Sequence, residues 1–219
     1  MNNQNAYILG GGSFGSRAFS RLQTQYKPTN LTVIDINHNK LEKIIAEDGN
    51  AVVMDAISFL QTTTKKMDLN SWIIPAVPIH VAYEWLRQEL RSETMVKPIP
   101  VPKSIEAVMP NPIYGTDGQL YASNADFRCP DNCSEPDKYC TVTGKLRPQI
   151  LYDTLTGLKE TGYHSICIVS TQLAPGVGGF LMRTLHEALK EIITRPGKIL
   201  VSTSCKCHCV INAIQVSYD

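Results

Sequence analysis

The stretch AYILGGGSFG, residues 6–15, decides the fold at the start of this chain. Ala6–Leu9 is apolar and typical of a buried strand, and the glycines that follow have the spacing G-x-G-x-x-G at the start of a helix. In this setting Gly10 makes a tight turn, Gly12 lets the backbone approach a pyrophosphate, and Gly15 allows close helix–strand contact. Ser13 and Phe14 open the helix, whose unpaired N–H groups favour phosphate. The stretch predicts a dinucleotide-binding βαβ unit.

An acidic residue at the end of the next strand selects the dinucleotide. Asp35 ends Leu31–Asp35, twenty residues after Gly15. A carboxylate there accepts hydrogen bonds from the ribose hydroxyls of NAD and repels the 2′-phosphate of NADP. No arginine follows it closely. We therefore expect NAD or a close relative; the alternative is a glycine-rich turn beside an exposed aspartate.

The first 95 residues alternate between strand-like and helix-like segments, which predicts a doubly wound parallel sheet of Rossmann-like α/β class. Residues 96–148 contain most of the thirteen prolines, and there only Ile105–Met109 has a strand-like pattern. A helix is expected at Gln149–Glu160 and another at Val177–Ile193. We expect one continuous sheet, and we divide the chain into three parts. These are a dinucleotide-binding domain (1–95), a proline- and cysteine-rich metal- or cluster-binding insertion (96–148), and a C-terminal α/β portion that completes the sheet and the cysteine site (149–219). The alternative is two domains with a boundary near residue 95.

The charge and composition of the chain limit the classes of partner that it is expected to bind. The formal net charge is +1, so no basic surface for nucleic acid or anionic membrane is expected. No apolar run reaches the roughly 20 residues of a membrane helix, and the N-terminus lacks signal-peptide features. We expect a cytoplasmic protein. Its expected partners are a dinucleotide and either a redox partner or a small-molecule substrate, and a homodimer stays open.

Seven cysteines are many for a reducing compartment, where clustered cysteines are more often metal or redox ligands than disulfides. Cys129, Cys133 and Cys140 have the spacing C-x3-C-x6-C in a loop rich in Pro and Asp. Cys205 and Cys207 are favoured to complete the site, with His208 and Cys209 as substitutes. Four thiolates suit a [4Fe–4S] cluster or tetrahedral zinc, and the lack of paired C-x2-C spacing favours the cluster. Unligated cysteines are the remaining alternative.

From Tyr7 to Arg91 the chain resembles the TrkA-N (RCK) domain of potassium-transport regulators. The resemblance implies NAD binding, and it places Asp55, after the third strand, near the adenine. Two differences from that family mean that its role in potassium regulation is not inferred for this chain. The fourth strand runs into Pro75-Ala76-Val77-Pro78, and nothing after residue 95 resembles the regulatory domain of those proteins.

The whole chain also resembles a little-characterised family of small prokaryotic proteins described as an NAD-binding domain joined to an iron–sulfur cluster. The motifs that carry this resemblance are Cys129 to Cys140, Gln172–Gly179 and Cys205-Lys206-Cys207-His208. The resemblance implies an Fe–S ligand set but no assigned reaction.

Three functions follow as hypotheses. The first is an NAD-dependent oxidoreductase or electron-transfer protein, and the second is a non-catalytic sensor of NAD(H) and redox state. The third is a nucleotide-binding protein with structural zinc. His80, after the fourth strand, is a candidate acid–base residue or a simple capping residue. Gln172–Gly179 is favoured as a tight turn over a phosphate site.

Overall fold

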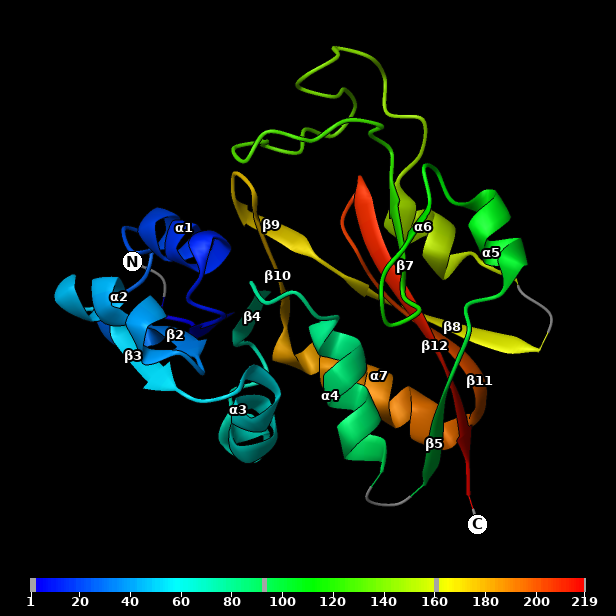
Figure 1. Cartoon of the computed structure of the whole chain (residues 1–219), viewed down its shortest axis with the longest axis horizontal. Coiled ribbons are helices and arrows are strands. Elements are labelled where there is room, and N and C mark those ends of the chain that lie inside the picture. Colours follow the sequence, from blue (N-terminus) through cyan, green and yellow to red (C-terminus); the bar gives the residue numbers. More distant parts are fainter. Residues whose placement is uncertain (1–2, 92–93, 160–161, 219) are drawn as a thin grey trace.

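The structure is a computed structural model that describes residues 3–91, 94–159 and 162–218. Its strands form two six-stranded sheets that lie side by side, with helices between them and outside them (Figure 1). The mixed α/β class and the Rossmann-like parallel unit predicted from the sequence are confirmed. The single continuous sheet is not found, since the strands divide between two sheets.

The first sheet has the strand order β3-β2-β1-β4-β10-β9. Its first four strands are parallel, and short apolar strands joined by helices dictate this, because a parallel pair needs a crossover connection. The last two strands come from the C-terminal part of the chain and pair antiparallel. The strands are β1 (Ala6–Leu9), β2 (Leu31–Asp35), β3 (Asn50–Val53), β4 (Trp72–Pro75), β9 (Thr171–Ala174) and β10 (Val177–Leu181).

The second sheet is mainly antiparallel and has the order β6-β7-β12-β11-β8, with β5 also paired to β12. Only the β8–β11 pair is parallel. Strand β12 is its longest, and it pairs with β11, β5 and β7. The strands are β5 (Met95–Ile99), β6 (Ile113–Tyr114), β7 (Leu120–Ser123), β8 (Tyr163–Val169), β11 (Gly197–Ser204) and β12 (His208–Ser217).

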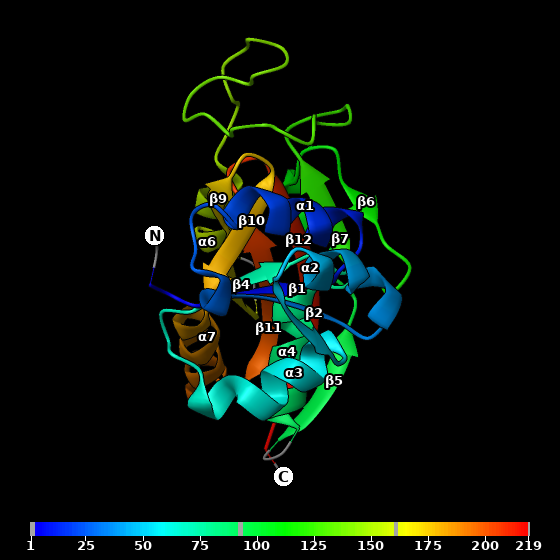
Figure 2. The same ribbon diagram turned by 90° about the vertical axis from the view of Figure 1, so that its left-hand side faces the viewer.

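Three apolar cores place the helices in layers on the two sheets (Figure 2). One core lies under α1 and α2, one joins the two sheets through α3, α4 and α7, and one lies under α5 and α6. The helices are α1 (Ser13–Leu22), α2 (Glu42–Ala46), α3 (Ala56–Thr63), α4 (Val81–Leu90), α5 (Lys103–Val108), α6 (Leu151–Thr156) and α7 (Met182–Thr194), with 3₁₀ turns η1 (Pro28–Asn30), η2 (His38–Lys40) and η3 (Thr64–Lys66).

Strand alternation explains why both faces of the second sheet are covered. Ile199 and Val201 of β11 face the central core, whereas Leu200 between them faces α5 and α6. Side chains of successive strand residues point to opposite faces, so the middle of this strand, Ile199–Val201, is apolar on both faces. No helix in the described ranges combines the length and apolar character needed to cross a bilayer.

Two element predictions were wrong. Most of the strand expected at 105–109 is helix α5, which buries Ile105, and the extended residue Met109 that follows the helix is also buried. The helix expected from Val177 starts at Met182. Residues 177–181 form β10 instead, because Gly178 and Gly179 weaken a helix and Phe180 fills the core beside β4.

Residues 124–148, here called the cysteine loop, contain no helix or strand beyond the isolated bridge between Tyr139 and Leu146. Regular structure therefore extends further into the 96–148 segment than the sequence indicated, up to Ser123 at the end of β7. The loop lies over one end of the second sheet and reaches towards α1 and the β9–β10 hairpin (Figures 1 and 2).

Candidate functional site

The glycine motif occupies the turn between β1 and α1. Gly10 has φ +116°, and a Cβ there would lie 2.6 Å from the carbonyl oxygen of Ala76. A Cβ on Gly15 would lie 1.7 Å from the carbonyl oxygen of Gly10. These two positions exclude any side chain because the protein's own backbone fills the space.

Gly12 differs from both, since a Cβ on it would meet no atom within 4 Å. It is the N-cap residue of α1, and no side chain caps that helix. The first-turn N–H groups of α1 thus adjoin open space, with Ser13 and Phe14 exposed there. Packing within the protein does not explain a glycine here, but a phosphate that approaches the backbone does.

Asp35 is buried at the end of β2 and holds the glycine loop in place. Its Oδ2 accepts a hydrogen bond of 2.8 Å from the Gly11 N–H, and its Oδ1 accepts one of 2.8 Å from the Asn37 N–H. The Lys40 Nζ lies 3.7 Å from Oδ2. Each carboxylate oxygen has a second lone pair, so the group can still accept from ribose hydroxyls.

Apolar side chains stand exposed beside Asp35, a feature that sequence reasoning missed. Ile36 is 71% exposed and Val53 is 53% exposed, and Asp35 and Val53 are cross-strand neighbours. Such a surface at the carboxyl ends of β2 and β3 suits a flat aromatic base. Apolar residues directly after a predicted strand end were the available signal.

Asp55, expected near the adenine, is the N-cap of α3. Its Oδ1 accepts hydrogen bonds from the N–H groups of Ile57 and Ser58, at 3.0 and 2.9 Å. The carboxylate therefore has a structural role that needs no ligand.

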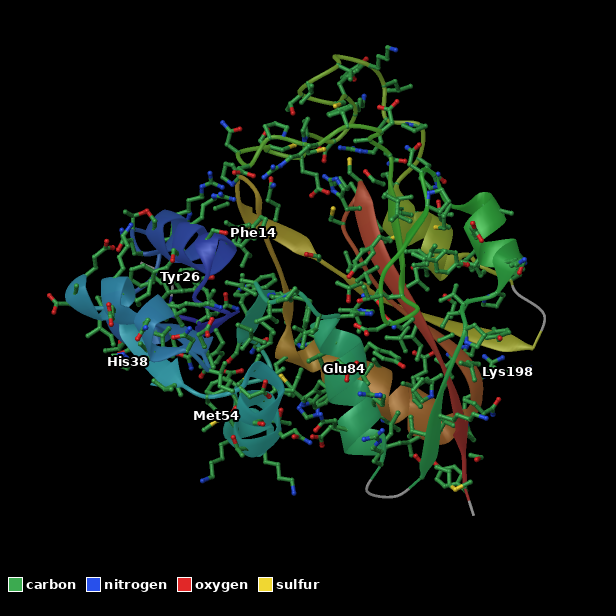
Figure 3. All side chains as sticks on the ribbon, in the orientation of Figure 1. Phe14, Tyr26, His38, Met54, Glu84 and Lys198 are labelled. Atoms are coloured by element: carbon green, nitrogen blue, oxygen red, sulfur yellow. The ribbon has the colours of Figure 1, made fainter. Side chains whose placement is uncertain are left out.

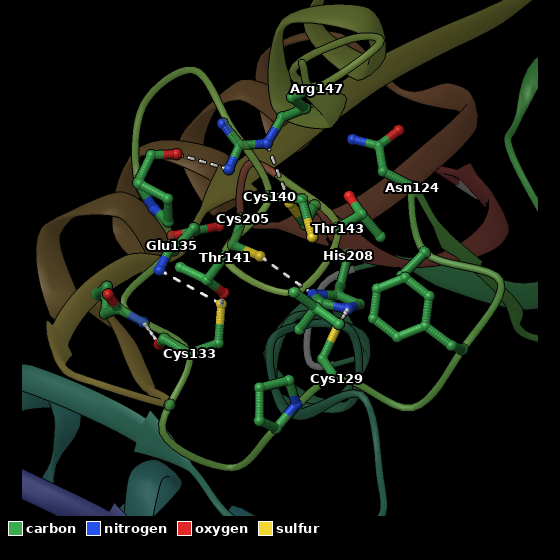
Figure 4. A pocket seen from close by; sticks show the side chains of 18 of the residues that line it. Asn124, Cys129, Cys133, Glu135, Cys140, Thr141, Thr143, Arg147, Cys205 and His208 are labelled. Atoms are coloured by element: carbon green, nitrogen blue, oxygen red, sulfur yellow. Dashed lines mark hydrogen bonds between the residues drawn. The ribbon is translucent and has the colours of Figure 1, made fainter. Parts of the chain in front are cut away.

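The structure brings the two cysteine clusters together on one cavity of about 690 Å³, here called the thiol cavity (Figure 4). Thiols reach it from the cysteine loop and from the turn between β11 and β12. His208, the first residue of β12, also contributes its imidazole. The cysteines that line it are Cys129, Cys133, Cys140, Cys205 and Cys207.

Four thiols interact around Cys129. Burial raises its pKa, and the neighbouring thiols of Cys133, Cys207 and Cys140 raise it further. Arg147 donates from Nε to the Cys207 Sγ at 3.0 Å, and its two terminal nitrogens donate to backbone carbonyls of the loop at 2.7 Å. These contacts tie the β11–β12 turn to the cysteine loop.

Cys205 is the fifth thiol and has different neighbours. Burial first, and then the Glu135 carboxylate, raise its pKa to about 12, so the protonated thiol is favoured. Its Sγ lies 3.7 Å from Nδ1 of His208, whose Nε2 lies 3.5 Å from the Cys129 Sγ. Cys140 is the opposite case, because N–H and hydroxyl donors from Thr143 lower its pKa.

Cys209, expected as a substitute ligand, lies outside the thiol cavity, and the structure does not bring it to the other thiols. It is a buried residue of β12 that faces the core under α5 and α6, and burial raises its pKa to about 12. Within residues 3–91, 94–159 and 162–218, no three His, Cys, Asp or Glu side chains are placed to hold a metal ion. The donors suit a thiophilic metal, but their present arrangement does not enclose one.

A second cavity, of about 290 Å³, lies between α1, the carboxyl end of β4 and the β9–β10 hairpin. Strand order reverses between β4 and its neighbour β1, and ligands of open α/β sheets bind at such a point. Phe14 and Gly176–Gly178 line both cavities. Figure 3 shows Phe14 at the end of α1 that lies nearer the second sheet. Phe14 and the β9–β10 hairpin therefore form a wall that the two cavities share.

Comparison with known proteins gives two family matches. Residues 82–217, more than half of the chain, match the AF_1314_C family model, described as "Uncharacterized protein, C-terminal domain". The chain belongs to the AF_1314_C family. Residues 6–65 match the TrkA-N domain. An Archaeoglobus fulgidus protein with the name "Uncharacterized protein" is similar, with 28% identity over 224 residues, which cover 95% of this chain and 98% of that protein.

The two matches divide the site between them. The TrkA-N match contains the glycine motif and Asp35, which supports NAD(H) binding by that part of the chain. The AF_1314_C match contains all seven cysteines, the cysteine loop and the β9–β10 hairpin. In this family member the two parts meet at Phe14 and the hairpin.

His80, the candidate acid–base residue, lines neither cavity. It is buried between α4 and the second sheet, with Nδ1 2.8 Å from the Asn212 Oδ1 and Nε2 2.9 Å from the Thr203 Oγ1. Burial lowers its pKa to about 4. His80 is therefore a neutral polar bridge between the parallel unit and the second sheet. The Gln172–Gly179 segment is the β9–β10 hairpin, in agreement with the favoured tight turn.

Proposed function

We propose that this AF_1314_C-family protein is an NAD-binding redox protein that carries a cysteine-ligated [4Fe–4S] cluster beside the dinucleotide. The observation that supports it most is the wall shared by the two cavities, formed by Phe14 and Gly176–Gly178. A nucleotide on the glycine loop and a group on the thiols would be neighbours. Electron exchange between them needs such proximity.

The dinucleotide would be held by the TrkA-N part. Open space at Gly12 leaves room for the pyrophosphate, and the Asp35 carboxylate would accept from the adenosine ribose. Ile36 and Val53 would contact the adenine. The proposed cofactor-binding residues are Gly10, Gly12, Ser13, Phe14, Gly15, Asp35 and Asp55.

The ligand set we propose is Cys129, Cys133, Cys140 and Cys207. The effect of the other three thiols on the pKa of Cys129 supports this set, and Arg147 donates from Nε to the Cys207 Sγ at 3.0 Å. Cys205 instead interacts with Glu135 and His208. When bound, an iron–sulfur cluster supplies single-electron exchange and nicotinamide supplies hydride chemistry.

The protein's own groups would orient and shield these partners. Arg147 holds the loop through the carbonyls of Pro136 and Asp137. Phe14 would separate the nucleotide from the thiols and exclude water at the shared wall. With these roles, the chain would act as an NAD-dependent oxidoreductase or electron-transfer protein.

A non-catalytic sensor of NAD(H) and redox state is the second candidate. The positions of two imidazoles favour the sensor. His80 lines neither cavity, and both ring nitrogens of His208 contact thiols, so neither is free to act as an acid or base on a substrate. Tight NADH binding without turnover in the presence of a one-electron acceptor would support the sensor. Steady NADH oxidation would support the oxidoreductase.

Anaerobic purification followed by metal analysis tests the cluster. About four iron and four sulfide per chain are expected, with broad visible absorption. Cys129→Ser and Cys207→Ser should lose the iron, whereas the matched control Cys167→Ser, which alters a thiol outside the cavity, should keep it. A colourless protein with about one zinc per chain would replace the cluster with a structural metal.

Binding of NADH by titration calorimetry tests the nucleotide site separately. Gly12→Ser should abolish measurable binding, because its side chain enters the pyrophosphate space. The same variant should retain the melting temperature, since serine is a favourable N-cap and meets no atom of the protein. Unchanged NADH affinity in a folded Gly12→Ser protein would reject this site.

A further inference from the structure

The cysteine loop contacts α1, the helix that follows the glycine motif, through Asp131. Asp131, between Cys129 and Cys133, forms an ion pair of 2.8 Å with the Arg17 guanidinium of α1. One turn further along α1, Arg21 donates to the Asp131 carbonyl at 2.8 Å and also to the Pro175 carbonyl. Two arginines on one face of α1 thus hold the segment that carries the first two thiols.

The β9–β10 hairpin holds the same segment from its other side. The N–H of Gly176 donates to the Cys133 carbonyl at 3.0 Å, and Gln172 Nε2 donates to it at 2.8 Å. A Cβ on Gly176 would lie 1.9 Å from the Asp131 carbonyl oxygen. The loop backbone at Asp131 is therefore packed directly on the hairpin.

Arg17 also contacts the glycine motif. Its guanidinium lies 5.3 Å from the centre of the Phe14 ring, in a cation–π arrangement. Phe14 precedes Gly15 and lines both cavities. One side chain therefore touches the wall of the nucleotide site and the segment between two thiols.

We propose that Arg17 is a positioning residue that couples the two sites, so that dinucleotide binding orders the cysteine loop and an ordered loop strengthens dinucleotide binding. The proposal rests on the proposed function for its dinucleotide, and it holds whether the thiols carry iron, zinc or no metal. The loop has little secondary structure, so ordering it costs conformational entropy. A ligand that fixes Phe14 restricts Arg17 and thereby Asp131. Each site then loses less conformational entropy when it binds its own ligand. Reciprocity is required by linkage.

Hydrogen exchange of the full-length protein as purified, with and without saturating NADH, tests the coupling. In the wild type, NADH should slow exchange of backbone amides in 126–147 by about threefold to tenfold, the effect expected of a partly exposed ion pair and weak coupling. Arg17→Met should remove this NADH-dependent change, and NADH affinity should fall about threefold.

Two further variants separate coupling from a general structural role. Arg17→Lys keeps the charge and should retain part of the protection. The charge exchange Arg17→Asp with Asp131→Arg restores an ion pair but not the contact with the Phe14 ring, so NADH-dependent protection should stay absent; its full return would overturn the route through Phe14. A structural effect alone would change exchange equally with and without NADH.

Failure of the coupling, of the role of Arg17 and of the proposed function would each give a different result. NADH binding by the wild type with unchanged loop exchange would overturn the coupling and leave the proposed function standing. Protection that persists in Arg17→Met would overturn the role of Arg17. A wild type that binds no NADH would overturn the proposed function together with the coupling.

Discussion

Acidification should destabilise the protein through His80. The imidazole is buried against Asn212 and Thr203 and stacks on Tyr83, with ring centroids 5.9 Å apart. Burial holds its pKa at about 4, below the usual 6.5, so the folded protein keeps the ring neutral. The unfolded chain binds a proton more readily as pH falls, which favours unfolding.

The sign and size follow from linkage. The contribution of the neutral ring is fully present above pH 6.5 and is lost as pH falls from 6.5 towards about 4. The loss is about 2 kcal/mol at pH 5 and about 3 kcal/mol at pH 4. For a chain of this length, a loss of 2 kcal/mol lowers the melting temperature by about 4–8 °C.

Urea unfolding at pH 7 and pH 5 measures this contribution, with His80→Gln as the reference. The glutamine side chain does not titrate, so the difference in unfolding free energy between wild type and variant should shrink by about 2 kcal/mol between the two pH values. Other titrating groups are common to both proteins and cancel in the comparison. A difference that stays constant with pH would refute the assignment of His80 as a buried neutral ring.

Three further substitutions test the nucleotide site and the cysteine assignment. Gly15→Ala should destabilise the fold by about 3 kcal/mol or more, measured by urea unfolding, because its Cβ would overlap the Gly10 carbonyl. Asp35→Asn should raise NADPH affinity relative to NADH, measured by calorimetry, because the charge that repels the 2′-phosphate is gone; an unchanged ratio would contradict the ribose role. Cys209→Ala should leave the metal content unchanged, while the loss of metal would place Cys209 back among the ligands.

The parallel unit could be predicted because its signals are local. Ala6–Leu9, the glycine spacing and Asp35 lie within thirty residues of one another, and the constraint on Gly15 comes from the carbonyl of Gly10 in the same turn. Sequence also indicated that the two cysteine clusters belong to one site. Composition and spacing alone selected Cys129, Cys133, Cys140, Cys205 and Cys207, and all five line the thiol cavity.

What the sequence left undecided depends on partners distant in the chain. Residues 177–181 are a strand because β4 offers an edge to pair with, and no local pattern reveals that edge. Cys209 faces the core because it lies in β12, which begins at His208, and is in register with Ala122 of β7.

The sequence by itself therefore determined the nucleotide fold and indicated the candidate thiols, since each of these signals is a short motif. Only the tertiary structure decided that the second sheet is separate and that Arg17 of the glycine helix meets Asp131 of the cysteine loop. These two residues are more than one hundred positions apart in the chain. Their contact follows from how two sheets pack on a shared core, and that packing is a property of the whole chain.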